Sequence, residues 1–442
     1  MNTFFKSLSY FNDVILWGYV GLGMIISFGL YLSFKARWLQ IFQFGKAFNH
    51  FIACARNKQC LVELVEEERG VSPIKLFFAT IGGAIGIGNV AGVALAIQIG
   101  GPGALVWVLM VALLGMIIKY SEVYLGIKYR RHTDKNSYEG GPMYFLQKAF
   151  PKYPWIASIM AFLLCIYGVE IYMFDVVQHS FEVNFHMDST IVMLLFLALI
   201  FLGVCGGVKR VGSINSVLIP CFVLIYLSMT LWVIYQEIHM LPEVLMMILK
   251  SAFTGHAAAG GFAGSTFILT LSKGLASGAY SGDIGIGYAS IIHSETKFKD
   301  PSQQASLAIL GIFLDTFIVC TCTILLVVVT GVWKLNMDSS LLVQEALSHY
   351  FPYTGYFMPL CLFVLGYSTI TAYFVAGMKC AEFLLPSYGK TLYGLYGTFA
   401  FIFFSFVESR YAFMIMNIAG GLLMVINLAG IMKLRKDIVY KV

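Results

Sequence analysis

Long apolar segments alternate with short polar ones along almost the whole chain. Eleven segments are long enough to cross a membrane as helices, near residues 11–34, 75–99, 104–129, 154–183, 189–208, 212–236, 262–292, 302–333, 352–385, 389–407 and 411–432. A spanning helix needs about 20 mostly apolar residues, because its backbone polar groups must be satisfied within the segment. The pattern predicts an all-α polytopic membrane protein with eleven transmembrane helices.

Two of these segments contain the same glycine-rich pattern, G-x-I-G-I-G. One copy runs from Gly83 to Gly88 and the other from Gly282 to Gly287. Glycine weakens a helix because it has no Cβ and leaves backbone groups uncovered. Such groups persist at membrane depth only where they line a cavity or are buried in protein. A matched pair of broken helices in the two halves of a chain is typical of the substrate site of secondary transporters.

The position of the two patterns divides the chain into repeats. We expect a leading transmembrane helix with a cytoplasmic linker in 1–74, a first five-helix repeat in 75–236, a second repeat with its preceding loop in 237–434, and a cytoplasmic tail in 435–442. Each repeat then begins with a glycine-broken helix. Because five is odd, the second repeat enters the membrane from the opposite side, which predicts an inverted repeat. The alternative is that Gly82, Gly86 and Gly92 only permit close helix packing.

Composition and charge agree with a membrane protein. Hydrophobic residues make up 59% of the 442 residues and charged residues only 12%, whereas globular chains have about 25% charged residues. The net charge of +6 is explained by loop lysines and arginines rather than by binding to nucleic acid. Most of these residues lie in alternate loops, and only Lys6, Lys250, Lys334 and Arg410 lie on the other side. The positive-inside rule therefore places the N-terminus outside and the C-terminus in the cytoplasm of a bacterial-type plasma membrane.

The residues from Ala79 to Val93, followed by Gly100–Ala104, resemble the signature of the alanine/glycine:cation symporter family. Shorter matches follow in order, at residues 119–122, 128–130, 140–144, 313–316, 330–333, 368–370 and 379–380. The resemblance implies sodium-coupled uptake of a small neutral amino acid through a ten-helix core of two inverted repeats. Sodium is then the co-transported ion, and no organic cofactor is expected. The oligomeric state stays open.

The first glycine pattern offers groups for both ligands. The amides of Gly86, Ile87 and Gly88 would begin the second half-helix, where the helix dipole favours a carboxylate. Sodium needs several oxygen ligands, which the carbonyls of Gly82 and Ile85 would supply. The hydroxyls of Ser368 and Thr369 join them if their helix packs there, although such hydroxyls often bond their own helix.

A second ion site follows from another resemblance. The residues from Gly82 to Asn89 are also similar to those of sodium-coupled neurotransmitter-type transporters that share this core. That similarity implies that Ala84 and Asn89 hold a second sodium ion. The alternative for Asn89 is that its side chain caps the half-helix.

The chain departs from the family pattern at positions that line the family's pocket. The family's Asn-Glu-Ala-Gly block reads Gly282-Asp283-Ile284-Gly285, its Gly-Trp pair reads Ala372-Tyr373, and its Gln/Asn-rich stretch reads Gly168 to Asp175. We expect Met173, Gly282, Asp283, Ile286, Thr369 and Tyr373 to line the pocket. Because Tyr is smaller than Trp and Gly282 leaves extra room, we expect the pocket to admit an amino acid other than, or larger than, alanine. We also expect Glu170 and Asp175 to add carboxylates that bind an amine or a proton.

Alternative functions remain to be weighed. Proton coupling through Glu170 or Asp175 is the nearest, with the same core fold. Other ionisable residues within spans are functional candidates. Lys119 and Glu122, three residues apart, are expected to satisfy each other. For Asp315, a role in packing and a contact with an ion both stay open. The chain has neither a G-x-S-x-G nor an H-E-x-x-H motif, so an intramembrane enzyme is disfavoured. A channel is disfavoured because paired breaks favour an occluded site over an open pore.

Overall fold

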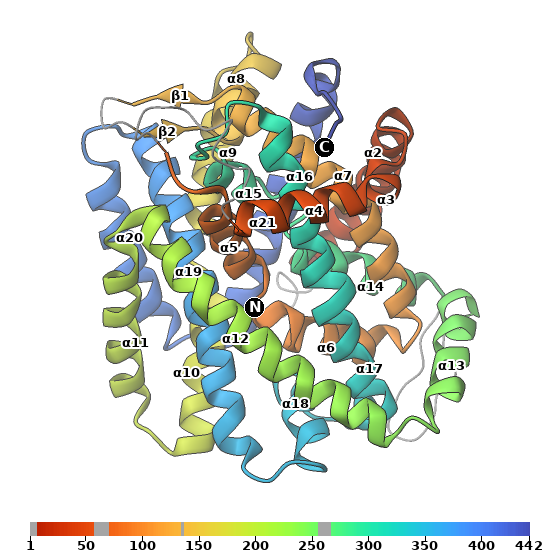
Figure 1. The fold of residues 1–442 in the computed structure, drawn as a ribbon. Coiled ribbons are helices and arrows are strands. Elements are labelled where there is room, and N and C mark those ends of the chain that lie inside the picture. The colour runs from red at the N-terminus through yellow and green to blue at the C-terminus, as the bar shows by residue number, and fades with distance from the viewer. Residues whose placement is uncertain (1–6, 57–69, 134–136, 255–266) are drawn as a thin grey trace.

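A computed structural model of the chain describes residues 7–56, 70–133, 137–254 and 267–442. Figure 1 shows a bundle of long helices with short helices at its ends. The leading span is a π-helix, η1 (Phe11–Gly21), which continues as α2 (Leu22–Lys35). The predicted linker contains α3 (Leu39–Phe42) and α4 (Phe44–Ala55), and its residues 57–69 lie outside the described part of the chain.

The helices of the first predicted repeat are α5 (Pro73–Ala84) with η2 (Ile87–Asn89) and α6 (Ala91–Gly100), α7 (Ala104–Lys128), α9 (Trp155–Tyr167) with α10 (Ile171–Phe185), α11 (Ser189–Val204) and α12 (Gly207–Gln236). Those of the second are α14 (Phe267–Ser281) with α15 (Tyr288–His293), α16 (Pro301–Ile312) with η3 (Phe313–Cys320) and α17 (Thr321–Val329), α19 (Thr354–Leu384), α20 (Gly389–Phe404) and α21 (Ser409–Lys433).

Short elements connect these helices. They are the antiparallel strands β1 (Arg131–His132) and β2 (Tyr138–Glu139), the helices α8 (Pro142–Ala149), α13 (Leu241–Thr254) and α18 (Ser339–Ser348), and the 3₁₀ turns η4 (Val332–Lys334) and η5 (Arg435–Asp437). The spans alone do not predict these connecting elements, because they contain polar residues and fall between the apolar segments.

Helical structure occupies each of the eleven predicted ranges. By length and composition, seven helices of the described residues can cross a membrane, or eight if the bent pair Pro73–Ala84 and Ile87–Gly100 is one span. Three of the predicted spans are therefore shorter or more interrupted than a standard spanning helix. The membrane character of the fold is confirmed, and the number eleven stays a prediction.

The two glycine-rich segments are broken where the sequence predicts. The first bends by 58° between Ala84 and Ile87, and the second loses helical structure over residues 282–287. A third interruption, at residues 168–170 between α9 and α10, was not predicted. There, Glu170 has a left-handed backbone conformation with φ of 52°.

The two glycine-broken helices pack against each other in opposite directions. α5 contacts α15, and α6 contacts α14. The first half of each broken helix therefore faces the second half of the other, so the two breaks lie at similar depth. This is the arrangement that an inverted repeat requires.

Two of the glycines serve close packing rather than unwinding. A Cβ on Gly82 would lie 2.0 Å from Nδ2 of Asn215 on α12, and one on Gly83 would lie 2.4 Å from the hydroxyl of Tyr288 on α15. That hydroxyl donates to the carbonyl of Ala79 (2.9 Å). Close packing therefore explains Gly82 and Gly83, while the break itself begins after Ala84.

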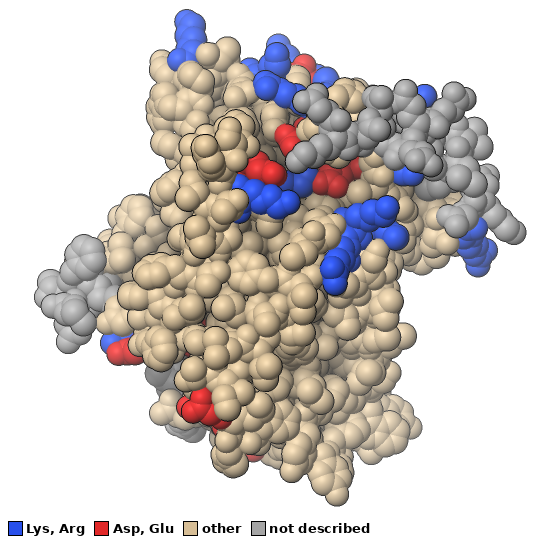
Figure 2. Space-filling model, turned by 90° about the vertical axis from the view of Figure 1, so that its left-hand side faces the viewer, with Lys and Arg blue, Asp and Glu red and all other residues tan. Residues whose placement is uncertain are grey.

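Charged side chains gather at one end of the molecule. Figure 2 shows Lys, Arg, Asp and Glu concentrated there, above a broad face that is almost without charge. The C-terminal residues dock at the same end: the Nζ of Lys128 donates to the carbonyl of Asp437 (2.7 Å), and the ring of Tyr440 stacks on Tyr120. This distribution is typical of a protein whose uncharged belt lies in lipid.

Candidate functional site

The first break leaves buried backbone amides without acceptors in a helix. Gly86 is extended, with φ of −131° and ψ of −164°, and its amide donates to Oδ1 of Asn89 (2.9 Å). Asn89 thus caps the half-helix, as the alternative interpretation predicts. Ile87 and Gly88 come first in that half-helix, where helix geometry provides no acceptor for their amides. Because the Gly86 amide is occupied, Ile87 and Gly88 are the amides left for an anion.

Helices from both halves of the chain meet at Gly86. A Cβ there would lie 2.6 Å from Oγ1 of Thr369 on α19 and 3.3 Å from Cε of Met173 on α10. Thr369 Oγ1 also donates to the carbonyl of Gly82 across the helix interface (3.1 Å). The structure therefore brings together Gly82, Gly86, Met173 and Thr369, all of which are predicted site residues.

Ser368 makes a different contact from its neighbour. Its hydroxyl donates to the carbonyl of Leu365 in its own helix (2.9 Å), as isolated membrane hydroxyls commonly do. Ile85 is fully buried at the break. Of the two predicted hydroxyl ligands, Thr369 is thus the one that already reaches the first broken helix.

Asn89 connects the first break to Asp315. Its Nδ2 donates to Oδ1 of Asp315, which lies in the π-helix η3 and is fully buried. The other oxygen of Asp315 accepts from Thr316 Oγ1 (2.7 Å). Ala84 and Asp315 also line one small internal cavity. The two residues predicted for a second ion therefore meet a buried carboxylate, whose role the sequence left open.

The second break is fixed by side chains of other helices. Asp283, Gly285 and Gly287 have φ values of 49°, 76° and 99°, so the chain there is left-handed. The Nζ of Lys119 donates to the carbonyl of Gly282 (2.9 Å). Glu122, one turn further along α7, accepts from the amide of Ser290 (3.1 Å).

Asn427 on α21 completes this clamp. Its Nδ2 donates to the carbonyl of Gly285 and to Oε2 of Glu122, both at 2.9 Å. The spacing of Lys119 and Glu122 predicts that they mainly satisfy each other, but the structure gives each of them other partners. Each binds a backbone group that the break leaves free, and Asn427 was missed although a lone amide in an apolar span was a signal.

Aromatic side chains surround Asp283. The hydroxyl of Tyr373 donates to its Oδ1, and the rings of Tyr373 and Tyr288 stack with centroids 4.0 Å apart. Tyr167 packs edge-on against Tyr373, with centroids 5.4 Å apart. Ile286 is fully buried within the same break. The predicted pocket residues Asp283 and Tyr373 are thus in direct contact.

The two carboxylates predicted on the third broken helix differ in position. Glu170 lies in the break itself and is 1% exposed, close enough to Asp283 for their charges to interact. Asp175 lies one turn further along α10, is only partly buried, and its charge acts on Tyr172. Glu170 therefore joins the site between the breaks, and Asp175 lies further from it.

A cavity leads toward the first break from one end of the bundle. It measures about 730 Å³ with its open mouth and is lined by residues of η1, η2, α6, α10, α14 and α21, among them Asp13, Gly88, Tyr172, Ser277 and Tyr280. Gly88 lies next to the ring of Tyr280, since a Cβ on it would be 3.4 Å from Cε1. A small molecule entering this vestibule would therefore meet the unwound backbone.

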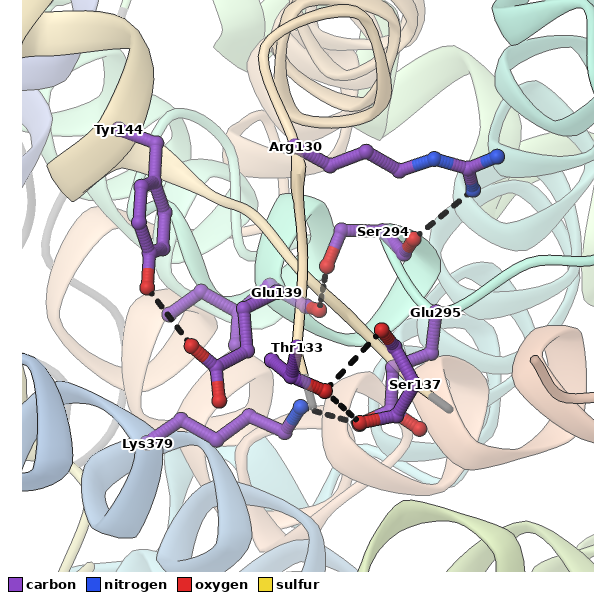
Figure 3. A network of polar contacts seen from close by, with 9 residues as sticks. Arg130, Thr133, Ser137, Glu139, Tyr144, Ser294, Glu295 and Lys379 are labelled. Atoms are coloured by element: carbon purple, nitrogen blue, oxygen red, sulfur yellow. Dashed lines mark hydrogen bonds and ion pairs between the residues drawn. The ribbon is translucent and has the colours of Figure 1, made fainter. Parts of the chain in front are cut away.

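A second polar network joins the segments that follow α7 and α15 to α19 (Figure 3). Lys379 on α19 forms an ion pair with Glu295, in the segment that follows α15. The guanidinium of Arg130 donates to the carbonyls of Ser294 (3.0 Å) and Thr296 (2.7 Å). Burial lowers the pKa of Arg130 below its usual value, but a guanidinium stays charged. These contacts tie α19, the segment that follows α7 and the segment that follows α15 to one another.

The chain is similar in sequence to known membrane transporters. The family model described as the sodium:alanine symporter family matches residues 1–442. An uncharacterized transporter of Haemophilus influenzae is 30% identical over 97% of this chain and 93% of its own length. The sodium/alanine symporter AgcS of Methanococcus maripaludis is 28% identical over 97% of this chain and 95% of its own.

The fold also resembles a solved transporter. The crystal structure of MhsT in complex with L-phenylalanine aligns with a TM-score of 0.55, covering 81% of this chain and 89% of that one, at 15% identity. At this identity the likeness shows the fold alone.

Proposed function

The chain belongs to the sodium:alanine symporter family, and on that premise we propose that it takes up a small neutral amino acid together with sodium by alternating access. Its family and relatives are transporters of the membrane, not enzymes. The proposal includes the five-plus-five inverted repeat, the outside N-terminus and the cytoplasmic C-terminus in a bacterial-type plasma membrane.

The first break is the observation that carries this proposal. The amides of Ile87 and Gly88 point from the start of a half-helix, where partial positive charge favours a carboxylate. A carboxylate bound there would accept hydrogen bonds from these amides, which otherwise have no acceptor among the described residues. The glycine at position 88 allows the ligand to approach the backbone closely.

Two oxygen-rich positions beside this break would hold sodium. One comprises the carbonyls of Gly82 and Ile85 with Thr369, and with Ser368 after a rotamer change. The other comprises Ala84 and Asn89, to which the structure adds the buried Asp315. Sodium is a hard cation that prefers such carbonyl, hydroxyl and carboxylate oxygens, as calcium and magnesium do.

Alternating access would use the two ends of the bundle. The vestibule beside Gly88 is open at the end that carries Asp13, near the N-terminus. The Lys379–Glu295 ion pair and the Arg130 contacts close the other end. With the orientation inferred from loop charge, this is an outward-accessible state whose cytoplasmic contacts must separate for release.

Uptake by the reconstituted protein tests the proposal. Proteoliposomes containing the full chain should accumulate a radiolabelled neutral amino acid under an inward sodium gradient, and not when potassium replaces sodium. Accumulation driven by a pH gradient without sodium would instead establish proton coupling, with Glu170 or Asp175 as the carrier.

Competition defines the substrate range. The twenty common amino acids would be added in turn as unlabelled competitors. Competition by residues larger than alanine would support an altered pocket, because Tyr373 and Gly282 replace larger groups of the family pattern. Competition by glycine and alanine alone would refute that part of the proposal.

A further inference from the structure

Among the residues that the structure describes, three buried oxygens without hydrogen-bond partners come from the segments at the second and third breaks. They are Oε2 of Glu170, Oη of Tyr280 and Oδ2 of Asp283, and we call them the acceptor trio. Glu170 and Asp283 are 1% and 4% exposed.

The members of the acceptor trio are joined by one set of contacts. The amide of Asp283 donates to the carbonyl of Tyr280 (3.4 Å), and the hydroxyl of Tyr373 donates to Oδ1 of Asp283. The ring of Tyr373 packs against Tyr167 (5.4 Å between centroids), whose carbonyl accepts from the amide of Glu170 (3.1 Å). The trio comes from three places: Glu170 from the break between α9 and α10, Tyr280 from the end of α14, and Asp283 from the break that follows it. The left-handed backbone at Glu170 and Asp283 turns these side chains out of regular helix positions.

This cluster contains more carboxylates than its basic residue can pair, so it must take up either a cation or a proton. A buried carboxylate without a partner costs several kcal/mol, and two like charges close together raise that cost. Lys119 is the basic residue whose charge acts on Asp283, but it also acts on Glu122 and Asp315, and its ammonium is bonded to Gly282. One lysine cannot balance four carboxylates.

We propose that the acceptor trio binds the ammonium group of the transported amino acid, each oxygen accepting one of its N–H groups. This inference rests on the proposed function and assigns the other half of the zwitterion. A primary ammonium has three donors, which matches the three unpartnered oxygens. Sodium would need more oxygens than the trio supplies.

The surroundings favour an organic ammonium over a metal ion. Tyr373 bonds Asp283 through its hydroxyl, and its ring packs edge-on against Tyr167; aromatic faces attract ammonium groups. Tyr280 also touches Gly88, so the acceptor trio adjoins the amides proposed for the carboxylate. One amino acid can therefore reach both ends of the site.

The proposal has a consequence for specificity. Each N-methyl group removes one donor and adds bulk among three acceptors. L-Alanine should therefore bind better than N-methyl-L-alanine, and N,N-dimethyl-L-alanine should bind worst. L-Lactate, which keeps the carboxylate but has no ammonium, should not bind.

Binding to the full-length protein in detergent tests this. Ligand-induced shifts in the melting temperature would be titrated with sodium alone, and then with each of these four compounds in saturating sodium. The variants are Glu170→Gln, Asp283→Asn and Tyr280→Phe. The matched control is Glu182→Gln, at an exposed position of α10, the helix that follows Glu170.

The expected result is specific to the amine. The three variants should keep the sodium-induced shift and bind L-alanine about tenfold to hundredfold more weakly, as expected for a lost charged hydrogen bond. Discrimination against N-methylated forms should shrink in each, and the control should match the unsubstituted protein. If Glu170→Gln does not fold, Tyr280→Phe carries the test, because it removes only an uncharged oxygen.

Other outcomes overturn the inference. Loss of the sodium-induced shift in these variants would assign the acceptor trio to sodium. Unchanged alanine binding with altered pH dependence of uptake would assign it to a proton. Failure of the unsubstituted protein to respond to sodium would instead refute the proposed function, so the two failures are distinguishable.

Discussion

The two glycine-broken helices are interrupted by the same pattern but are stabilised in different ways. At the first break, Asn89 of the same segment bonds the amide of Gly86, and Thr369 on α19 bonds the carbonyl of Gly82. At the second, Lys119 and Glu122 on α7 and Asn427 on α21 bond the backbone from outside. The second break is therefore held by three side chains of two other helices, whereas a ligand is proposed for the amides of Ile87 and Gly88 at the first.

This difference indicates a division of roles. Free backbone groups at membrane depth are costly unless a ligand satisfies them, so the first break is suited to bind and release. The second break presents side chains, notably Asp283, on a backbone whose carbonyls at Gly282 and Gly285 are bonded by side chains of α7 and α21. Side chains of the second break can then contact a ligand in a fixed position, without a change in the backbone of the break during each transport cycle.

Removing the clamp at the second break should have the largest effect. Lys119→Met leaves the Gly282 carbonyl unpaired and removes the positive charge near three carboxylates, those of Glu122, Asp283 and Asp315. We expect destabilisation of about 3–5 kcal/mol, seen as a much lower melting temperature in detergent. Lys250→Met, at an exposed position of α13, is the control. A stable and active Lys119→Met protein would show that the second break needs no clamp.

A backbone change at the same break should come next. Gly287 has φ of +99°, and a Cβ would lie 2.8 Å from both Met160 Cε and Pro142 Cγ. Gly287→Ala should cost about 1–2 kcal/mol of backbone strain, with steric strain in addition. Gly23→Ala, where no atom lies within 4 Å of the new Cβ, should leave the melting temperature nearly unchanged. Equal melting temperatures for the two variants would contradict this.

At the first break, function should suffer more than stability. Asn89→Ala removes the cap of Gly86 and the contact with Asp315, which should cost about 1 kcal/mol of stability. Sodium-driven uptake should nevertheless be lost, because the side-chain amide of Asn89 is also proposed to ligate an ion. Parallel melting curves and uptake assays check this, and an uptake rate that falls only as far as stability does would make Asn89 a cap alone.

The smallest effect separates two adjacent hydroxyls. Thr369 reaches Gly82 on the other helix, whereas Ser368 bonds its own helix. Thr369→Val should raise the sodium concentration for half-maximal uptake by about tenfold, the loss expected for one hydrogen bond. Ser368→Ala should raise it less. The reverse order would mean that Ser368 turns toward the ion when sodium binds.

The sequence predicted the breaks because their cause is local. Gly285 and Gly287 adopt positive φ, and Gly88 has no side chain to block a ligand, so the glycine pattern reports them directly. The interruption at Glu170 follows a single glycine, Gly168, and such an isolated signal is too common to predict a break.

The contacts that hold the site are not local and were less predictable. The spacing of Lys119 and Glu122 predicts an ion pair between them. It does not show that α7 packs against backbone groups of the second break, which become the partners of both side chains. Asn427, Tyr280 and Asp315 were visible only as polar groups in apolar segments. Their partners are set by helix packing between residues more than a hundred positions apart, which one sequence does not reveal.

Hydrogen–deuterium exchange of the two breaks tests the division of roles most directly. The full-length protein would be measured with and without sodium plus the amino acid identified by the uptake panel. We predict that ligands slow exchange in peptides covering residues 85–90 by about tenfold or more, while peptides covering 282–290 are protected already and change little. Strong ligand-induced protection at 282–290 with none at 85–90 would contradict the account.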